Sequence, residues 1–224
     1  MKNCLKLPFF IWMANVHCTL CARLVKFRAA SGRRYPGYHA APVEAFGDLN
    51  PSWLIVGLAP GMHGANRTGR PFTGDHAGIL LFDTLHAIGA SSAAYSISQN
   101  DGLQLHGVRI TNAVKCLPPE NKPAAAEARN CNKFLSAEID QLVDVRVIVA
   151  LGHIAHNSIL DALGFSRSAY KFKHGAEYYF SAGKNSQRVL IDSYHCSRYN
   201  TQTKRLTSVM FKNILARAKL LAEL

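Results

Sequence analysis

Residues 53–75 read WLIVGLAPGMHGANRTGRPFTGD, a short apolar run that leads directly into a loop holding five glycines. The run at 53–57 has the length and β-branched content of a strand buried on both faces of a parallel sheet. Because glycine has no Cβ, a loop rich in it lets the backbone approach a neighbouring group closely. The stretch therefore predicts a buried strand followed by a ligand-binding loop.

Three later apolar runs resemble the first one, and helical patterns separate and follow them. The predicted strands cover residues 53–57, 108–111, 145–151 and 188–191, and the predicted helices 79–89, 124–142, 154–163 and 206–224. Residues 29–51, rich in Gly, Pro and Arg, are expected to form an irregular lead-in. Alternating strands and helices predict an α/β fold with a mainly parallel sheet covered on both faces.

Each predicted strand ends in polar or glycine-rich sequence. These ends are GLAPG at 57–61, TN at 111–112, LGH at 151–153 and DSYHCSRYN at 192–200. In open parallel sheets, ligands bind outside the carboxyl ends of the strands. We therefore expect the four ends to form one pocket.

The length and charge of the chain limit its class. With 224 residues it suits one compact domain, and its 26 Lys and Arg against 14 Asp and Glu leave a net charge of +12. That surface favours a polyanionic partner, although charge alone does not separate nucleic acid from a membrane surface or from a generally basic protein. No stretch approaches the roughly 20 apolar residues of a spanning helix. The opening MKNCLKLPFFIWMA lacks a small-residue cleavage site, so we interpret it as an extension, or as the result of a start codon assigned too far upstream, and we expect an intracellular protein.

The six cysteines divide into two groups. Cys18 and Cys21 form a C-x-x-C pair, and fourteen residues separate Cys116 from Cys131. Two close ligands and two distant ones make a plausible four-thiolate site, and the spacing does not decide between zinc and an iron–sulfur cluster. The other two, Cys4 and Cys196, are expected to be buried free thiols.

Together these motifs resemble the uracil-DNA glycosylase superfamily, and within it the fifth family of b-type iron–sulfur enzymes. The resemblance rests on GLAPG…HGANRTGRPFTGD, TNAVKCLPPENKP, ALGHIAH, SYHCSRYNTQTKRLT and the four cysteines. It implies a three-layer α/β/α sandwich around a four-stranded, mainly parallel sheet. It also implies a single domain at 18–224 after an N-terminal extension at 1–17. Cys18, Cys21, Cys116 and Cys131 match the ligands of a structural [4Fe-4S] cluster.

The resemblance gives several residues a role in excising a flipped-out base. Phe72 matches the aromatic residue on which the base stacks, and Asn112 matches the amide that reads its Watson–Crick edge. His195 matches the histidine that donates a hydrogen bond to the departing base. The alternatives are a core phenylalanine and an amide that caps the strand end. The family usually has proline after this histidine, and here Cys196 stands instead.

Asp75 matches the carboxylate on which this family depends. We expect it to position the attacking water and to oppose the positive charge on the sugar. The competing interpretation is an N-cap for the following helix. The remaining predicted substrate contacts are Gly57, Leu58, Ala59, Gly61, His63, Asn66, Arg198 and Tyr199. The last two are expected to form the wedge that fills the gap left in the base stack by the extruded nucleotide. Predicted phosphate contacts are Arg67, Arg70, Lys204 and Arg205, with steep salt dependence.

The resemblance therefore implies a monofunctional glycosylase that acts on uracil, and on deaminated bases such as hypoxanthine, in double-stranded DNA. We expect a monomer at the nucleoid of a prokaryotic cytoplasm. One rival is a non-catalytic damage-sensing protein with the same fold. The other is a phosphate-binding enzyme, which the chain disfavours because it lacks the G-x-x-x-x-G-K-[ST] and G-x-G-x-x-G patterns.

Overall fold

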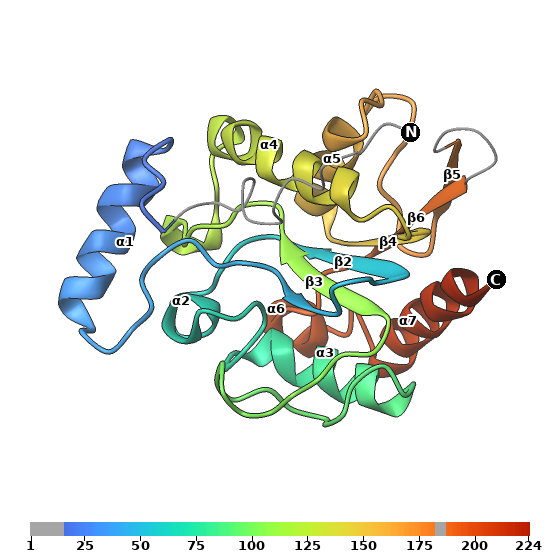
Figure 1. The fold of residues 1–224 in the computed structure, drawn as a ribbon, viewed down its shortest axis with the longest axis horizontal. Coiled ribbons are helices and arrows are strands. Elements are labelled where there is room, and N and C mark those ends of the chain that lie inside the picture. Colours follow the sequence, from blue (N-terminus) through green and yellow to red (C-terminus); the bar gives the residue numbers. More distant parts are fainter. Residues whose placement is uncertain (1–15, 182–186) are drawn as a thin grey trace, which may run out of the picture.

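A computed structural model describes residues 16–181 and 187–224, which form an α/β sandwich around one six-stranded sheet (Figure 1). The strands are β1 (Phe46–Gly47), β2 (Trp53–Gly57), β3 (Val108–Asn112), β4 (Val147–Leu151), β5 (Glu177–Ser181) and β6 (Gln187–Ser193). The helices are α1 (Ala22–Arg34), α2 (Ala65–Thr68), α3 (His76–Ala87), α4 (Ala125–Gln141), α5 (His153–Ala162), α6 (Arg198–Gln202) and α7 (Ser208–Glu223), with a 3₁₀ turn at Pro119–Asn121. Cys4 and most of the predicted N-terminal extension lie outside the described residues.

The sheet has the order β1-β3-β2-β4-β6-β5. Its four central strands run parallel and are the four that the apolar runs predict, so the predicted fold class is confirmed. Two antiparallel edge strands, β1 and β5, extend the predicted sheet from four strands to six. They escaped prediction because β1 has two residues and β5 is partly exposed, so neither reads as a buried apolar run.

The side chains of β2 alternate between two cores. Trp53 and Ile55 pack with α3 and α7, whereas Leu54 and Val56 pack with α4 and α5. Every residue of β2 is buried, because helices cover both faces of the sheet (Figure 1).

Helix α1 corrects the predicted irregular lead-in, since its last six residues fall within 29–51. Only Leu24, Arg28 and Ser31 of this helix are buried, so its apolar stripe is too narrow to be recognised by periodicity.

The strand register places the predicted pocket. Gly57 lies opposite Asn112, and Leu151 lies opposite Ser193. The carboxyl ends of the four parallel strands therefore meet at one edge of the sheet, as expected.

Candidate active site

A cleft of about 910 Å³ opens at the carboxyl edge of the sheet. Of the predicted site residues, Leu58, Ala59, Gly61, His63, Asp75, His195 and Arg198 line it. Other lining residues were not predicted from the motifs, among them Met62, Tyr95, Ser96, Asn121 and Ser197. Tyr95 and Ser96 belong to an irregular segment with no pattern that could have assigned them to the cleft.

Asp75 serves as the N-cap of α3, as one of its two predicted roles requires. Its Oδ1 accepts a hydrogen bond from the backbone N–H of Gly78 at 3.0 Å. Burial raises the pKa of this carboxyl group, against the opposing effect of the backbone amides of Gly78 and Ala77. The second oxygen, Oδ2, faces Gly61 and Gly64, so capping by Oδ1 leaves Oδ2 directed toward the glycine loop. The two roles are therefore compatible.

Two glycines of the loop lie close to Asp75. A Cβ added to Gly64 would lie 2.4 Å from Asp75 Oδ2, and one added to Gly61 would lie 3.5 Å from the same atom. The absence of a side chain at Gly64 therefore permits the position that Asp75 occupies.

Phe72 and Asn112 lie behind the cleft and do not line it. Phe72 is 5% exposed and belongs to the core on the α3 side, with φ at 55°. A Cβ added to Gly57 would lie 2.4 Å from Asn112 Oδ1 and 2.5 Å from Phe72 Cζ. Gly57 therefore brings the two side chains together, and their contacts with a base stay predictions.

His195 follows β6 and lines the cleft. Its ring lies 5.8 Å from that of Phe72, with 25° between the two planes. Burial lowers the pKa of His195 to about 4, so the imidazole is neutral at physiological pH. A neutral imidazole carries one N–H donor and one acceptor nitrogen.

Cys196 is fully buried in the core, so the prediction of a buried free thiol is confirmed. Burial raises the pKa of this thiol, and the negative charge of Asp75 adds to the effect. Cys196 therefore anchors the loop after His195 by packing in the core.

Three other predicted contacts differ in their exposure. Asn66 is fully buried and donates from Nδ2 to Ser31 Oγ at 3.0 Å, so it holds α2 against α1 and does not line the cleft. Arg198 lines the cleft at the start of α6, while Tyr199 beside it is 70% exposed. An exposed tyrosine next to the cleft suits the predicted wedge.

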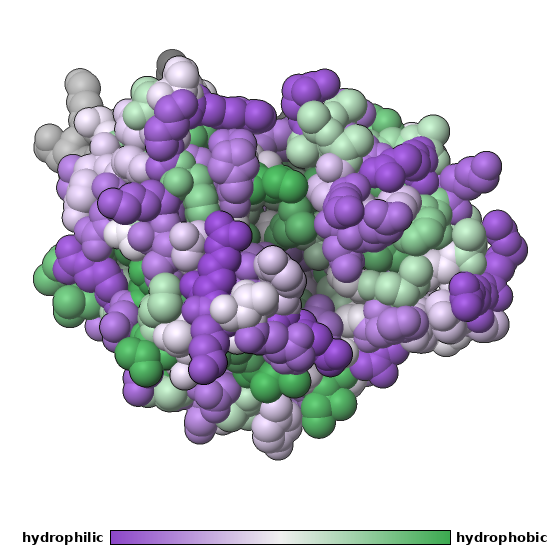
Figure 2. All heavy atoms as spheres, turned by 180° about the vertical axis from the view of Figure 1, so that it is seen from behind, coloured by the Kyte–Doolittle hydropathy of each residue, from purple (hydrophilic) through white to green (hydrophobic). Residues whose placement is uncertain are grey.

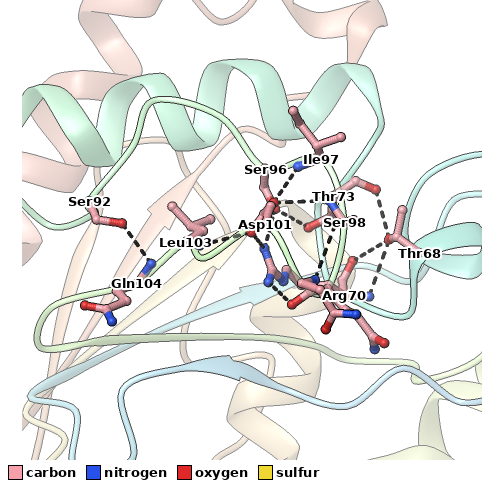
Figure 3. Close-up of polar contacts among 12 residues, drawn as sticks. Thr68, Arg70, Thr73, Ser92, Ser96, Ile97, Ser98, Asp101, Leu103 and Gln104 are labelled. Carbon is pink, nitrogen blue, oxygen red and sulfur yellow. Dashed lines mark hydrogen bonds and ion pairs between the residues drawn. The ribbon is translucent and has the colours of Figure 1, made fainter.

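Arg70 corrects the prediction of a phosphate contact. It is 5% exposed and forms an ion pair of 2.7 Å with Asp101, as Figure 3 shows. Arg70 also donates to Ser96 Oγ at 3.0 Å, and Thr73 Oγ1 lies 2.7 Å from the same hydroxyl. Burial opposes ionisation of Asp101, but the hydrogen bonds from Arg70 and from backbone amides hold its pKa well below the usual range. The pair fixes the glycine loop to the segment that carries Ser96.

The other three predicted phosphate contacts are exposed: Arg67, Lys204 and Arg205. Arg67 donates from Nε to the backbone oxygen of His63 at 2.8 Å, and Arg205 lies over the ring of Tyr194 at 4.5 Å. Figure 2 shows hydrophilic residues over most of one face, around a hollow with hydrophobic residues near its middle.

A fully buried pair, missed by the sequence analysis, lies beneath the His195 loop. His156 Nδ1 is 2.7 Å from Asp192 Oδ1, and His156 Nε2 is 3.1 Å from the backbone oxygen of Tyr170. Asp192 belongs to β6, three residues before His195, so the pair ties α5 to the strand that carries the histidine. The quoted motif ALGHIAH contains His156, which was the available signal.

The four predicted cluster cysteines, Cys18, Cys21, Cys116 and Cys131, line one small cavity. Arg28 donates to Cys116 Sγ at 3.1 Å, and the backbone N–H of Lys115 donates to Cys131 Sγ at 3.3 Å. Burial raises the pKa of Cys116, and it raises that of Cys131 to about 11.

Among the described residues, no group of three or more His, Cys, Asp or Glu side chains could hold a metal ion. The four cysteines nevertheless line one cavity, and thiolates are ligands both of zinc and of iron–sulfur clusters.

Known proteins match this chain along most of its length. The family model of the uracil DNA glycosylase superfamily matches residues 44–219. A type-5 uracil-DNA glycosylase of Thermus thermophilus is 48% identical over 212 residues, which cover 92% of this chain and 94% of the relative. A type-5 enzyme of Pyrobaculum aerophilum is 44% identical, covering 91% and 88%, and a type-4 enzyme of Sulfurisphaera tokodaii is 30% identical, covering 72% and 67%. In the described ranges, none of the helices has the length and apolar character to cross a bilayer.

Proposed function

Since this chain belongs to the uracil-DNA glycosylase superfamily, we propose that it hydrolyses the N-glycosidic bond of uracil flipped out of double-stranded DNA, in base-excision repair. The observation that carries the proposal is the convergence of Asp75 and His195 on one cleft. The two side chains come from loops after different strands and supply a carboxylate and a neutral imidazole.

Excision breaks the bond between the base and C1′, and the electron pair leaves with the base. The sugar becomes oxocarbenium-like, and water adds to C1′ and gives up a proton, which the departed base anion takes up through solvent. Asp75 orients this water and opposes the positive charge of the sugar, an interaction that is strong in a water-poor site. Its capped conformation supports this role, because the hydrogen bond from Gly78 holds the carboxylate in place.

His195 stabilises the leaving base. Because burial lowers its pKa to about 4, the neutral ring donates a hydrogen bond to the base oxygen without giving up its proton. Asn112, buried at the end of β3, reads the Watson–Crick edge. Phe72 provides the stacking surface. Stacking and one amide place few demands on the base, so the proposed substrates include hypoxanthine.

Exposed cations hold the duplex around the cleft. Arg67, Lys204 and Arg205 contact phosphates, and Arg198 with Tyr199 fills the gap that the extruded nucleotide leaves. The bacterial and archaeal sources of the relatives favour action at the nucleoid of a prokaryotic cytoplasm. We propose that residues 18–224 act there as a single monomeric domain after an N-terminal extension at 1–17.

The four cysteines of the small cavity would hold a [4Fe-4S] cluster with a structural role. When bound, the group supplies four cross-links between irons and thiolates. Arg28, which already donates to Cys116 Sγ, would offset the negative charge of the ligands. The segments that carry the thiols also meet through Arg23 of α1 and Glu127 of α4, whose Arg23 Nη2 to Glu127 Oε2 ion pair measures 2.6 Å.

The test is excision from duplexes that carry one uracil or one hypoxanthine, followed by cleavage at the abasic site. We expect activity in the wild type and a large loss in Asp75→Asn and His195→Ala. The matched controls are Asp83→Asn, on the helix that Asp75 caps, and His106→Ala, both exposed. Folded, iron-loaded wild type that binds DNA but releases no base would overturn the proposal in favour of a non-catalytic sensor. Full activity in Asp75→Asn would leave an enzyme with a different mechanism.

A further inference from the structure

The end of α1 carries a group of aromatic rings at the rim of the cleft. Tyr35 and Tyr38 stack with ring centroids 4.6 Å apart and 15° between their planes. His63, which lines the cleft, meets both rings edge-on at 5.5 and 6.0 Å. The hydroxyl of Tyr38 lies 2.8 Å from His63 Nδ1. The stacked pair is therefore continuous with the wall of the cleft.

Backbone and side-chain contacts attach this group firmly to the glycine loop. The backbone N–H of His39 donates to the oxygen of Arg67 at 3.0 Å, and that of Ala40 donates to the oxygen of Asn66 at 3.0 Å. Ser31 of α1 accepts from Asn66 of α2. Figure 1 shows α1 at one side of the molecule, with α2 between it and the strand ends. The rings are thus held in place relative to the cleft.

Exposed positive charge lies beside the rings. Arg33 and Arg34 end α1, are exposed, and have no carboxylate on the same segment, because Glu44 is the first acidic residue of the chain. The guanidinium of Arg34 lies 5.5 Å from the centroid of the Tyr35 ring. Arg67 is exposed on the adjoining loop. Tyr35 and Tyr38 are half-buried beside these exposed cations. A cluster of exposed arginines on one face is typical of a surface that contacts nucleic-acid phosphates.

We propose that Arg33, Arg34, Tyr35 and Tyr38, here called the α1 surface, bind the DNA that flanks the extruded nucleotide on one side. The inference rests on the proposed function, which brings DNA to the cleft. The arginines contact phosphates, and the half-buried tyrosines pack against the sugar–phosphate backbone of the flanking nucleotides. The hydrogen bond between Tyr38 and His63 joins this surface to the base-binding loop.

The first test measures the affinity for an undamaged duplex at several salt concentrations. The double variant Arg33→Ala/Arg34→Ala is expected to lower the slope of log K against log salt by about 1.8, because each phosphate that a protein neutralises adds about 0.9 to the slope. The control pair Arg146→Ala/Lys212→Ala removes the same charge from exposed positions before β4 and on α7. Its slope is expected to match the wild type. Tyr35→Leu is expected to weaken binding about tenfold, the effect of losing one hydrogen bond to a charged phosphate. Tyr179→Leu, which changes an exposed tyrosine on edge strand β5, is expected to bind normally.

The second test locates the contact on the DNA. A duplex with a central 2′-fluoro-deoxyuridine, whose sugar resists hydrolysis, is shortened stepwise from either end. Wild type is expected to lose affinity when one flank is cut and to tolerate the same cut on the other flank. Arg33→Ala/Arg34→Ala is expected to be insensitive on both sides, because the variant and the truncation remove the same interaction.

A wild-type salt slope in the double variant would overturn the proposal, as would an equal loss in the control pair. Symmetric sensitivity to truncation that persists in the double variant would do so too. Failure of the proposed function is distinguishable, since binding is measured on undamaged DNA. If the wild type excises no base but the double variant still has a smaller slope of log K against log salt, binding by the α1 surface is supported and the proposed enzymatic function is refuted.

Discussion

Replacing Gly64 with alanine tests whether the glycine loop sets the position of Asp75. The added Cβ would lie 2.4 Å from Asp75 Oδ2 and 2.6 Å from Asp75 Cβ, and ordinary contacts begin at 3.4 Å. The carboxylate and the loop must therefore separate by about 1 Å. A displacement of that size at a reacting group costs roughly 100-fold in rate. It also strains the cap on α3, and overpacking of this kind costs about 1–3 kcal/mol of stability.

The assay is single-turnover excision of uracil from a duplex, with urea unfolding measured beside it. Gly61→Ala is the graded comparison, because its Cβ would lie 3.5 Å from the same oxygen, an ordinary contact, and it should lose much less. Adding Asp75→Asn to Gly64→Ala should cost little further, since both changes act through one carboxylate. A folded Gly64→Ala protein with the wild-type rate would refute the reasoning.

The remaining predictions concern protons, an ion pair and the cysteines. Because burial raises the pKa of Asp75, the excision rate should fall on acidification, and the fall should begin above the pH range in which a carboxyl group ordinarily titrates. The rate should show no inflection near pH 6.5, because His195 stays neutral down to about pH 4. A profile of excision rate against pH checks both predictions. Asp101→Asn should lower the free energy of unfolding by about 3 kcal/mol in urea titrations, because it leaves a buried guanidinium without its partner. The pKa of the Asp101 carboxyl is lower in the folded state than in the unfolded state. Its contribution to the free energy of unfolding is therefore complete above the pKa of the unfolded state, and it is lost only as the pH falls through the pKa of the folded state. Cys131→Ser should reduce iron below about four per chain, while Cys196→Ala should leave the iron content unchanged.

Each of these has a clear contrary result. A rate inflection near pH 6.5 that is absent from His195→Asn would mean that the imidazole titrates normally. Equal stability of Asp101→Asn and wild type at pH 7 would deny the ion pair a structural role. Full iron content in Cys131→Ser would remove that residue from the ligand set.

The central strands were predictable because each is buried on both faces and therefore reads as a continuous apolar run. The run at 53–57 coincides with β2, and the run at 108–111 ends one residue before β3 does. Strand β5 and helix α1 were not predictable by the same reasoning, since an edge strand and a peripheral helix bury only part of their surface. Asp75 and His195 were assigned from motifs, and both line the cleft.

Arg70 and Asn66 show where the reasoning from sequence ended. Both lie in the glycine loop among groups that face the cleft, and both turn inward. Arg70 pairs with Asp101, which lies 31 residues along the chain, and Asn66 bonds to Ser31, 35 residues away. No local sequence pattern predicts such partners, because a polar side chain is buried only where a residue of a distant segment forms a hydrogen bond or an ion pair with it.

The sequence by itself determined the parallel core, the edge at which its strands end in polar residues, and the residue types offered there. These features depend on local periodicity and on glycine content, which are read within a few residues. Only the tertiary structure decided which cations face solvent, which glycine contacts the carboxylate of Asp75, and that Tyr35 and Tyr38 stand beside His63. The physical reason is that burial, ion pairing and close approach are properties of segments brought together by folding.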